Sequence, residues 1–123
     1  MSLKDTLKRK IEEHRPRTTR LVKEFGSTKV QEITIEQVIG GARDVKCLVT
    51  DVSYLDPQEG IRFRGKNIPE TMECLPKVPG RDYPYVEGFF WFLMTGEVPT
   101  MAETLEVVEE FKKRRALPQY VID

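Results

Sequence analysis

The chain has 123 residues, a length typical of one structural unit, and its 20 basic and 20 acidic residues give a formal net charge of +0. Hydrophobic residues make up 39% of the chain and charged residues 33%, a composition that indicates a globular, helix-rich protein and excludes a disordered one. The balanced charge gives no support to long-range attraction to nucleic acid or to an anionic membrane, although local basic patches remain open.

The two cysteines do not form a recognisable site. Cys47 and Cys74 are far apart, with no Cys-x-x-Cys motif and no pair of histidines nearby, so we expect no metal site and a reduced, intracellular setting. The longest apolar run, Phe89–Met94, is too short to cross a bilayer. The charged stretch Met1–Lys10 resembles neither a signal peptide nor a transit peptide.

An amphipathic helix is predicted from about Leu3 to Phe25, because apolar residues return about once per turn along this stretch. Pro16 lies inside it and removes a backbone hydrogen bond, at a cost of roughly 3 kcal/mol. The pattern therefore leaves open one bent helix or two consecutive helices. Gly26–Ser27 ends the segment.

The middle of the chain predicts a short helix and a hairpin. Thr34 and Gln37 fit a capping box that opens a helix ending at Gly40–Gly41. The stretch Lys46–Tyr54 is the best strand candidate, and Ile61–Arg64 can pair with it across the turn Asp56–Gly60.

The last third predicts three more helices. Pro69 and Glu70 open one over Ile68–Leu75, and Pro84 opens a second whose wide apolar face predicts deep burial before Gly96 ends it. The third begins at a capping box, Thr100–Glu103, and reaches about Arg115, after which Leu117–Pro118 breaks it and a new element starts near Tyr120. The predicted fold class is mainly α, with one small β-hairpin near residues 46–64.

Most candidate chemical groups have an ordinary structural explanation. His14, the only histidine, falls on a polar helix face, where a solvated side chain is expected, and we identify no catalytic residue. The pairs Glu12–Glu13 and Glu109–Glu110 are adjacent on helices and point apart. The run Lys112–Arg115 ends a helix, where cations suit the dipole; a phosphate or nucleic-acid contact is the alternative.

Two features leave a functional interpretation open. The aromatic run Phe89–Met94 is large for a small domain to cover, which favours a partner surface. Gly40–Gly41–Ala42–Arg43 ends a helix with two flexible residues and presents an arginine, whose planar fork suits phosphate oxygens. Alone, the Gly-Gly-x-Arg motif is a weak signal.

An ordered series of short motifs resembles citrate synthase, specifically the N-terminal part of the type found in mitochondria and some bacteria. The resemblance spans essentially the whole chain. Its motifs are Leu3–Asp5, Gln31–Thr34, Gly40–Arg43, Leu55–Pro57, Glu59–Gly65, Ile68–Glu70, Leu75–Pro76, Glu87–Gly88, Phe90–Trp91, Thr95–Gly96, Val98–Thr100 and Arg115–Pro118.

The resemblance implies a mostly α-helical, homodimeric enzyme that condenses acetyl-CoA with oxaloacetate to citrate and free CoA, with no covalently bound cofactor. In the family a carboxylate base and two histidines perform general acid–base catalysis. Those residues and the oxaloacetate-binding arginines belong to a later part of a much longer chain, and His14 matches none of them. The one ligand residue that the resemblance carries over is Arg43, as a contact to CoA phosphate.

We therefore expect residues 1–123 to be the N-terminal segment of the large helical domain of a citrate synthase, incomplete as a domain and inactive alone. Its expected partners are the remainder of the chain, a second subunit, acetyl-CoA and oxaloacetate, with no nucleic acid and no membrane. Arg62 and Arg64 are hypothetical contacts to those absent parts. The expected location is the cytoplasm in a bacterium or the mitochondrial matrix in a eukaryote.

Two other classes of function remain open at this point. A noncatalytic helical interaction module would use the Phe89–Met94 face to bind a full-length synthase or its own copies. A nucleic-acid binder would use Lys112–Arg115 and show salt-dependent binding. A reading frame that continues beyond Asp123 into histidine-bearing and aspartate-bearing motifs would favour the synthase segment over the module.

Overall fold

The computed structural model describes residues 1–122, and it divides the chain into two compact units. The larger unit contains residues 1–11 and the chain from Asp51 onward, and the smaller unit is Glu12–Thr50. No residue of the smaller unit is buried, whereas the larger unit holds a small core. The chain length alone suggested a single unit.

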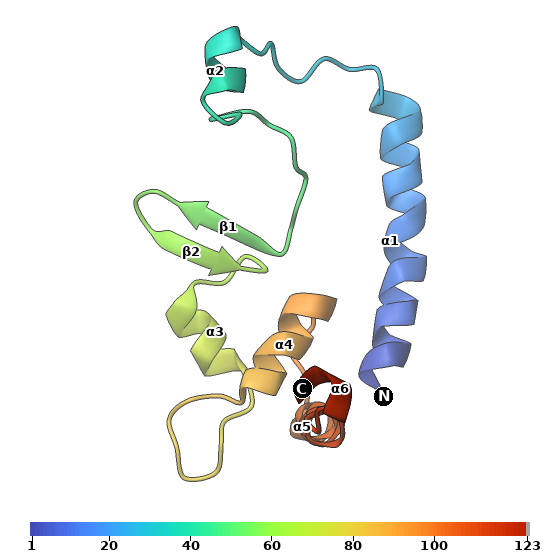
Figure 1. The fold of residues 1–123 in the computed structure, drawn as a ribbon, viewed down its shortest axis with the longest axis vertical. Helices are drawn as coiled ribbons and strands as arrows, with labels where there is room; N and C mark the ends of the chain where they lie inside the picture. The colour runs from blue at the N-terminus through green and yellow to red at the C-terminus, as the bar shows by residue number, and fades with distance from the viewer. Residues whose placement is uncertain (123) are drawn as a thin grey trace. The chain divides into compact units, whose positions relative to one another are not determined.

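The elements follow one another as six helices and one hairpin over the described residues (Figure 1). Their bounds are α1 Leu3–Phe25, α2 Ile35–Ile39, β1 Ser53–Asp56, β2 Gly60–Phe63, α3 Ile68–Cys74, α4 Val86–Thr95, α5 Met101–Arg114 and α6 Gln119–Ile122. The prediction of a mainly α fold with one small β-hairpin is confirmed. None of the helices in the described part combines the length and the apolar character that spanning a membrane requires.

The core of the larger unit lies where α4 packs against α5. Trp91 and Phe92 of α4 are 1% and 2% exposed, and Val107 of α5 is 3% exposed. Gly88 permits this contact, because a Cβ at its position would lie 3.2 Å from Oγ1 of Thr104. Thr104 is fully buried and donates its hydroxyl proton to the carbonyl of Thr100 at 3.0 Å.

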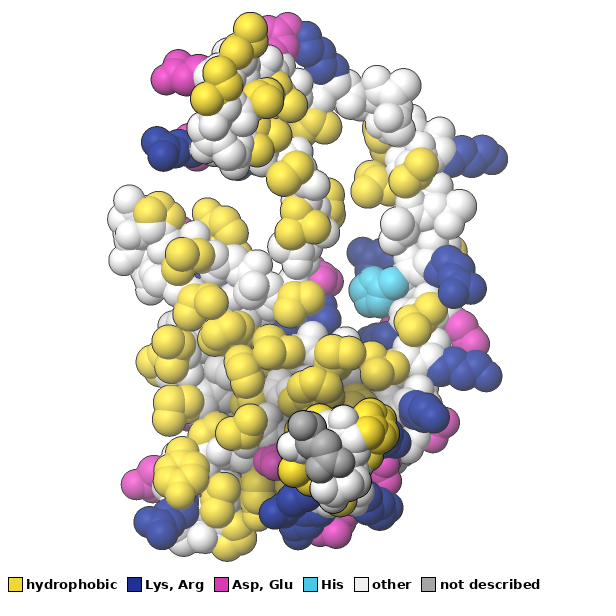
Figure 2. Space-filling view, in the orientation of Figure 1, with side chains coloured by type: hydrophobic (Ala, Val, Ile, Leu, Met, Phe, Trp, Pro, Cys, Tyr) yellow, Lys and Arg dark blue, Asp and Glu magenta, His cyan; other side chains and the backbone are white. Residues whose placement is uncertain are grey.

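The outer side of α4 is less buried than its apolar face predicted. Val86 and Met94 are 74% and 46% exposed, and Figure 2 shows hydrophobic side chains gathered over α3 and α4. The helix also begins at Val86, two residues after the predicted opener Pro84, which forms an isolated bridge with Lys77. Gly96 ends the helix as predicted, in the left-handed conformation with φ 77°.

The hairpin is shorter than predicted and begins later. Antiparallel pairing runs from Ser53 opposite Phe63 to Asp56 opposite Gly60, so residues 46–52 lie outside the strand. The predicted strand over Lys46–Tyr54 is therefore wrong for most of its length, because the four residues of β2 pair only with Ser53–Asp56. The turn is held by Asp56, whose Oδ1 accepts from the backbone N–H groups of Gln58 and Glu59 at 2.9 and 2.8 Å.

Helix α1 continues through Pro16, which decides between one helix and two. In the larger unit its first turns are tied to the connection between α4 and α5: Nη2 of Arg9 and Nζ of Lys10 each lie 2.7 Å from a carboxylate oxygen of Glu97. These two ion pairs fix the beginning of α1 against the core.

Capping boxes position three of the helices. The two predicted boxes, at Thr34 with Gln37 and at Thr100 with Glu103, are both present. A third was not predicted: Asn67 accepts from the backbone N–H of Glu70 at 2.9 Å, and Glu70 accepts from the backbone N–H of Asn67 at 2.8 Å. Asn67 takes the place of the serine or threonine usual in a capping box. The start of this helix was predicted from Pro69, and Asn67 was not considered as its cap.

Candidate functional site

The candidate site is the loop that follows α2 in the smaller unit and carries Arg43. Three residues around the arginine have left-handed backbone: Gly41 at φ 79°, Ala42 at φ 58° and Asp44 at φ 59°. A non-glycine residue in this region costs roughly 1–2 kcal/mol. Two such residues on either side of Arg43 indicate a loop whose shape is imposed by specific contacts rather than by local preference.

Two glutamines hold the loop. Gln37 of α2 donates from Nε2 to the carbonyl of Arg43 at 3.3 Å, and the backbone carbonyl of Gln37 accepts from the N–H of Ala42 at 2.7 Å. Gln31 donates from Nε2 to the carbonyl of Asp44 at 3.0 Å and accepts from the N–H of Lys46 at 2.8 Å. These amides bracket the Arg43 backbone from both sides. Gln37 was recognised from sequence as a capping residue only, and the role of Gln31 carries no local sequence signal.

The Arg43 side chain is exposed, and its guanidinium forms no hydrogen bond or ion pair within residues 1–122. Its five N–H donors are therefore open to solvent, and a planar fork of this kind suits phosphate or carboxylate oxygens. The loop can bind an anion. Arginine itself stays protonated, so Arg43 does not act as a general acid or base.

His14 lies exposed on α1, and its carbonyl accepts from the hydroxyl of Thr18 at 3.3 Å. Within the described residues, no group of three or more histidine, cysteine, aspartate or glutamate side chains could hold a metal ion. Cys47 is exposed and Cys74 half-buried, and both are free thiols.

The two arginines of the hairpin have different surroundings. Arg64, at φ 49°, directs Nε and Nη2 at the carbonyl of Leu93 at 3.1 and 2.7 Å, and Nη1 pairs with Asp51 at 2.7 Å. Its guanidinium thus caps the end of α4. Arg62 pairs with Glu59, which raises the pKa of the guanidinium, and donates to the carbonyl of Gly65 at 3.0 Å. Both side chains have partners inside the larger unit.

The basic run at the end of α5 is largely paired. Lys112 lies 2.7 Å from Glu109, and Lys113 and Arg114 lie 2.9 and 3.4 Å from Glu110. Lys113 first, and then Arg114, hold the pKa of Glu110 below its usual range. The run therefore resembles a solvated helix end with one-turn ion pairs more than a phosphate-binding surface.

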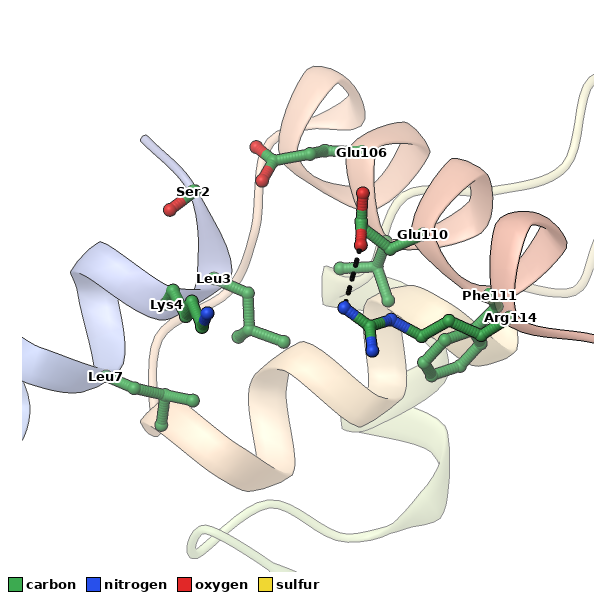
Figure 3. A pocket seen from close by; sticks show the side chains of 9 residues that line it. Ser2, Leu3, Lys4, Leu7, Glu106, Glu110, Phe111 and Arg114 are labelled. Atoms are coloured by element: carbon green, nitrogen blue, oxygen red, sulfur yellow. Dashed lines mark hydrogen bonds and ion pairs between the residues drawn. The ribbon is translucent and has the colours of Figure 1, made fainter.

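Two clefts open on the larger unit, and they differ in the polarity of their lining. The first, about 410 Å³, lies between the start of α1 and α5, with Leu3, Leu7 and Phe111 among its apolar lining and the Glu110–Arg114 pair at its edge (Figure 3). The second, about 310 Å³, lies between α3 and α4 and is almost wholly apolar. The hydroxyl of Thr71, which lines it, is buried without a hydrogen-bond partner in the described part of the chain. Both clefts suit packing more than catalysis.

Comparisons with known proteins give a consistent answer. A family model described as citrate synthase, C-terminal domain, matches residues 41–123. Curated relatives include the mitochondrial citrate synthase of Aspergillus niger, 47% identical over 98% of this chain, and that of Xiphias gladius, 46% identical over 98%. A probable mitochondrial citrate synthase of Glossina morsitans morsitans is also 46% identical. The chain spans about a quarter of the length of these relatives, 25–26%.

Proposed function

This chain belongs to the citrate synthase family, and on that premise we propose that it acts as part of a citrate synthase, which condenses acetyl-CoA with oxaloacetate to citrate and free CoA. The observation that carries the proposal is a match over 98% of the chain to proteins of which it spans 25–26%. In that setting the segment supplies helical scaffold, contacts to the remainder of the enzyme and to a second subunit, and an arginine for CoA phosphate. Beyond the two substrates, no cofactor is needed.

The chain alone is inactive under this proposal. General acid–base catalysis requires several groups placed around the reacting atoms. The single histidine of the chain, His14, is exposed on α1, and we identify no catalytic residue with it. The 123-residue chain mixed with acetyl-CoA and oxaloacetate should release no free CoA above background, measured with a thiol reagent. CoA release that requires oxaloacetate and rises with the concentration of the chain would overturn the proposal.

Arg43 is proposed to contact a CoA phosphate in the assembled enzyme. The support is its open guanidinium on a strained loop, because an arginine without an intramolecular partner keeps all its donors for a ligand. Losing a hydrogen-bonded charge contact costs about 1.5–3 kcal/mol, which is roughly a 10-fold to 100-fold loss of affinity.

The test uses a complete synthase that contains this segment. Arg43→Ala should raise KM for acetyl-CoA while KM for oxaloacetate stays unchanged, and Arg43→Lys should be intermediate because lysine keeps the charge but not the fork. Arg81→Ala is the control, since Arg81 is also exposed and has no proposed role. An unchanged KM for acetyl-CoA in Arg43→Ala would remove Arg43 from the site.

Placement within the family is proposed as the N-terminal segment of the large helical domain. The family model that matches is named for the C-terminal domain, so this placement rests on the order of the short motifs alone. A mitochondrial matrix location is proposed for a eukaryotic source, by analogy with relatives named as mitochondrial, and a cytoplasmic one for a bacterial source. Fractionation of the source cells tests the location.

A noncatalytic interaction module is the second candidate function, and the exposed apolar side chains of α4 favour it. Phe90 and Met94 are 36% and 46% exposed. A module would bind a separately produced full-length synthase, and Met94→Glu would weaken that binding. If the chain and the full-length enzyme do not associate in sedimentation experiments, this candidate fails.

A further inference from the structure

The least exposed residues of the smaller unit surround the Arg43 loop. Within Glu12–Thr50 every residue is exposed except Gln31, Gln37 and Val45, which are half-buried. Apolar side chains usually take the best-covered positions of a fold, and glutamine is mostly exposed. Here two of the three positions are amides, and each amide bonds the backbone of the loop. The best-covered side chains of this unit are therefore the ones that hold the loop.

The backbone of the loop forms a turn with Arg43 at its corner. The N–H of Val45 donates to the carbonyl of Ala42 at 3.1 Å, so Arg43 and Asp44 are the two central residues of the turn. Asp44 has φ 59°, a conformation that glycine adopts freely and that most residues with a Cβ adopt seldom. The turn therefore needs contacts from outside itself to stay in this shape.

Gln31 supplies such contacts with both ends of one amide. Its Nε2 donates to the carbonyl of Asp44 at 3.0 Å, and its Oε1 accepts from the N–H of Lys46 at 2.8 Å. A carbonyl and the N–H two residues further on are the groups that a neighbouring strand would bond in a sheet, so the amide takes the place of a strand. Neither group has another hydrogen bond within residues 1–122. Without Gln31 both would lose their partner.

Gln37 reaches the same loop but has a second task. Its Nε2 lies 3.3 Å from the carbonyl of Arg43, and its Oε1 accepts from the N–H of Thr34 at 3.0 Å in the capping box of α2. A substitution of Gln37 would therefore disturb the start of the helix as well as the loop. Gln31 lies outside the helices and strands, and within the described residues its amide bonds only the loop. Its effect on Arg43 can be isolated.

We propose that Gln31 is a positioning residue for Arg43, whose amide keeps the turn in the shape that presents the guanidinium to an anionic ligand. The inference rests on the proposed contact between Arg43 and a CoA phosphate. A site that is formed only part of the time loses affinity in proportion to the missing fraction. Gln31 therefore strengthens the binding of acetyl-CoA through the loop and takes no part in the chemical step.

The measurement uses the complete synthase. Gln31→Met keeps the length of the side chain and removes both hydrogen bonds, so KM for acetyl-CoA should rise roughly threefold to tenfold. The values of kcat and of KM for oxaloacetate should stay unchanged. Gln58→Met is the matched control, because the Gln58 side chain is exposed and forms no hydrogen bond in the described part of the chain. It should leave all three constants as they are.

Combination with Arg43→Ala separates positioning from a general structural role. If Gln31 acts through Arg43, then Gln31→Met should change KM for acetyl-CoA by less than about twofold once the arginine is gone. An equal rise in both backgrounds would overturn the inference. An effect of Arg43→Ala with none of Gln31→Met would overturn the role of Gln31 alone. An unchanged KM in Arg43→Ala would remove the proposed CoA contact, and this inference with it.

Asp44→Gly tests whether the shape of the turn is the cause. Glycine adopts a positive φ without a side-chain penalty, so the turn should then depend less on Gln31. Added to Gln31→Met, this change should recover part of the lost affinity for acetyl-CoA. An enzyme damaged elsewhere by Gln31→Met would also lose kcat and would not be rescued. A KM that does not fall in the double variant would overturn the inference.

Discussion

At the scale of single residues, Arg64 is the side chain that links the end of the hairpin to α4. Its guanidinium is 16% exposed and joins Asp51 to the last carbonyls of α4, which have no partner inside their helix. Arg64→Ala leaves those carbonyls without their charged donor, at an expected cost of about 1.5–3 kcal/mol in the free energy of unfolding. Urea unfolding measures it. Arg62→Ala, which removes a more exposed pair with Glu59, is the matched control and should cost much less; equal costs would contradict the assignment.

Glu97 makes the attachment of α1 dependent on pH. Lys10 first, and then Arg9, hold the pKa of Glu97 below its ordinary value of 4.5. A carboxylate with a lowered pKa in the folded state stabilises the fold fully above its unfolded value, and this contribution disappears as pH falls through the folded pKa. The carboxylate is 40% exposed, so each pair contributes only roughly 0.2–1 kcal/mol.

The pH dependence can be measured with Glu97→Gln. The difference in unfolding free energy between the parent chain and this variant should be largest near neutral pH and should shrink toward zero below pH 4.5. Glu73→Gln is the control, since Glu73 has no ion pair in the described part of the chain. A Glu97→Gln difference that stays constant from neutral pH down to acid pH would show that the two ion pairs contribute nothing.

At the scale of elements, Gly88 sets how closely α4 approaches α5. A Cβ there would lie 3.2 Å from Oγ1 and 3.4 Å from Cγ2 of Thr104, which is fully buried and would have to shift by a few tenths of an ångström. Gly88→Ala gains about 1 kcal/mol of helix propensity but overpacks the contact, which typically costs about 1–3 kcal/mol. We expect a net loss of stability. Adding Thr104→Ala should relieve it, so a double-mutant cycle should give a favourable coupling of about 1 kcal/mol; strict additivity would argue against a steric contact.

Pro16 is the element-scale feature that the sequence could not settle. The structure keeps α1 continuous, so the proline lacks one backbone hydrogen bond inside a formed helix. Pro16→Ala restores the donor and should stabilise this part of α1 by up to about 3 kcal/mol. Circular dichroism should show more helix, and amide exchange should slow in the turn around residue 16. If helix content falls instead, the proline is adapted to this position.

Local signals explain which elements could be predicted. The capping boxes at Thr34 and Thr100 and the left-handed Gly96 act through the nearest few residues, so the sequence alone located those helix ends. The strand predicted at residue 46 depended on a partner, and the hairpin pairs only from Ser53 onward. Local patterns carry no information about what lies across from a strand.

In the candidate site, too, local features could be predicted and contacts between distant residues could not. Arg43 could be singled out, because two glycines and an arginine form a recognisable local motif. The support from Gln31 could not, since that amide acts on the loop from 13 and 15 residues away. The contacts of Arg64 with Leu93 and Asp51 were not predicted, and its hypothetical contact to absent parts stays a hypothesis. Long-range contacts were in each case what the sequence failed to specify.

At the scale of the whole molecule, the distribution of buried side chains differs sharply between the two units. Among the described residues every buried side chain belongs to the larger unit, and the buried apolar ones are Leu75, Trp91, Phe92, Pro99 and Val107. Apolar burial contributes about 25 cal/mol per Å², so a unit that buries no side chain gains little stability of its own. The Arg43 loop therefore lies in the less stable part of the chain.

This difference predicts a contrast in native-state hydrogen exchange. Amides of residues 12–50 should exchange through local opening that costs little free energy, whereas those of α4 and α5 should approach the free energy of global unfolding. Mass spectrometry of peptides from both regions, labelled over times from seconds to hours, measures the contrast. Under the proposed contact between Arg43 and a CoA phosphate, local opening lowers the fraction of the chain that is competent to bind, so CoA should bind the isolated chain more weakly than it binds the assembled enzyme. Equal protection of the two regions would mean that residues 12–50 are stabilised by contacts other than buried side chains.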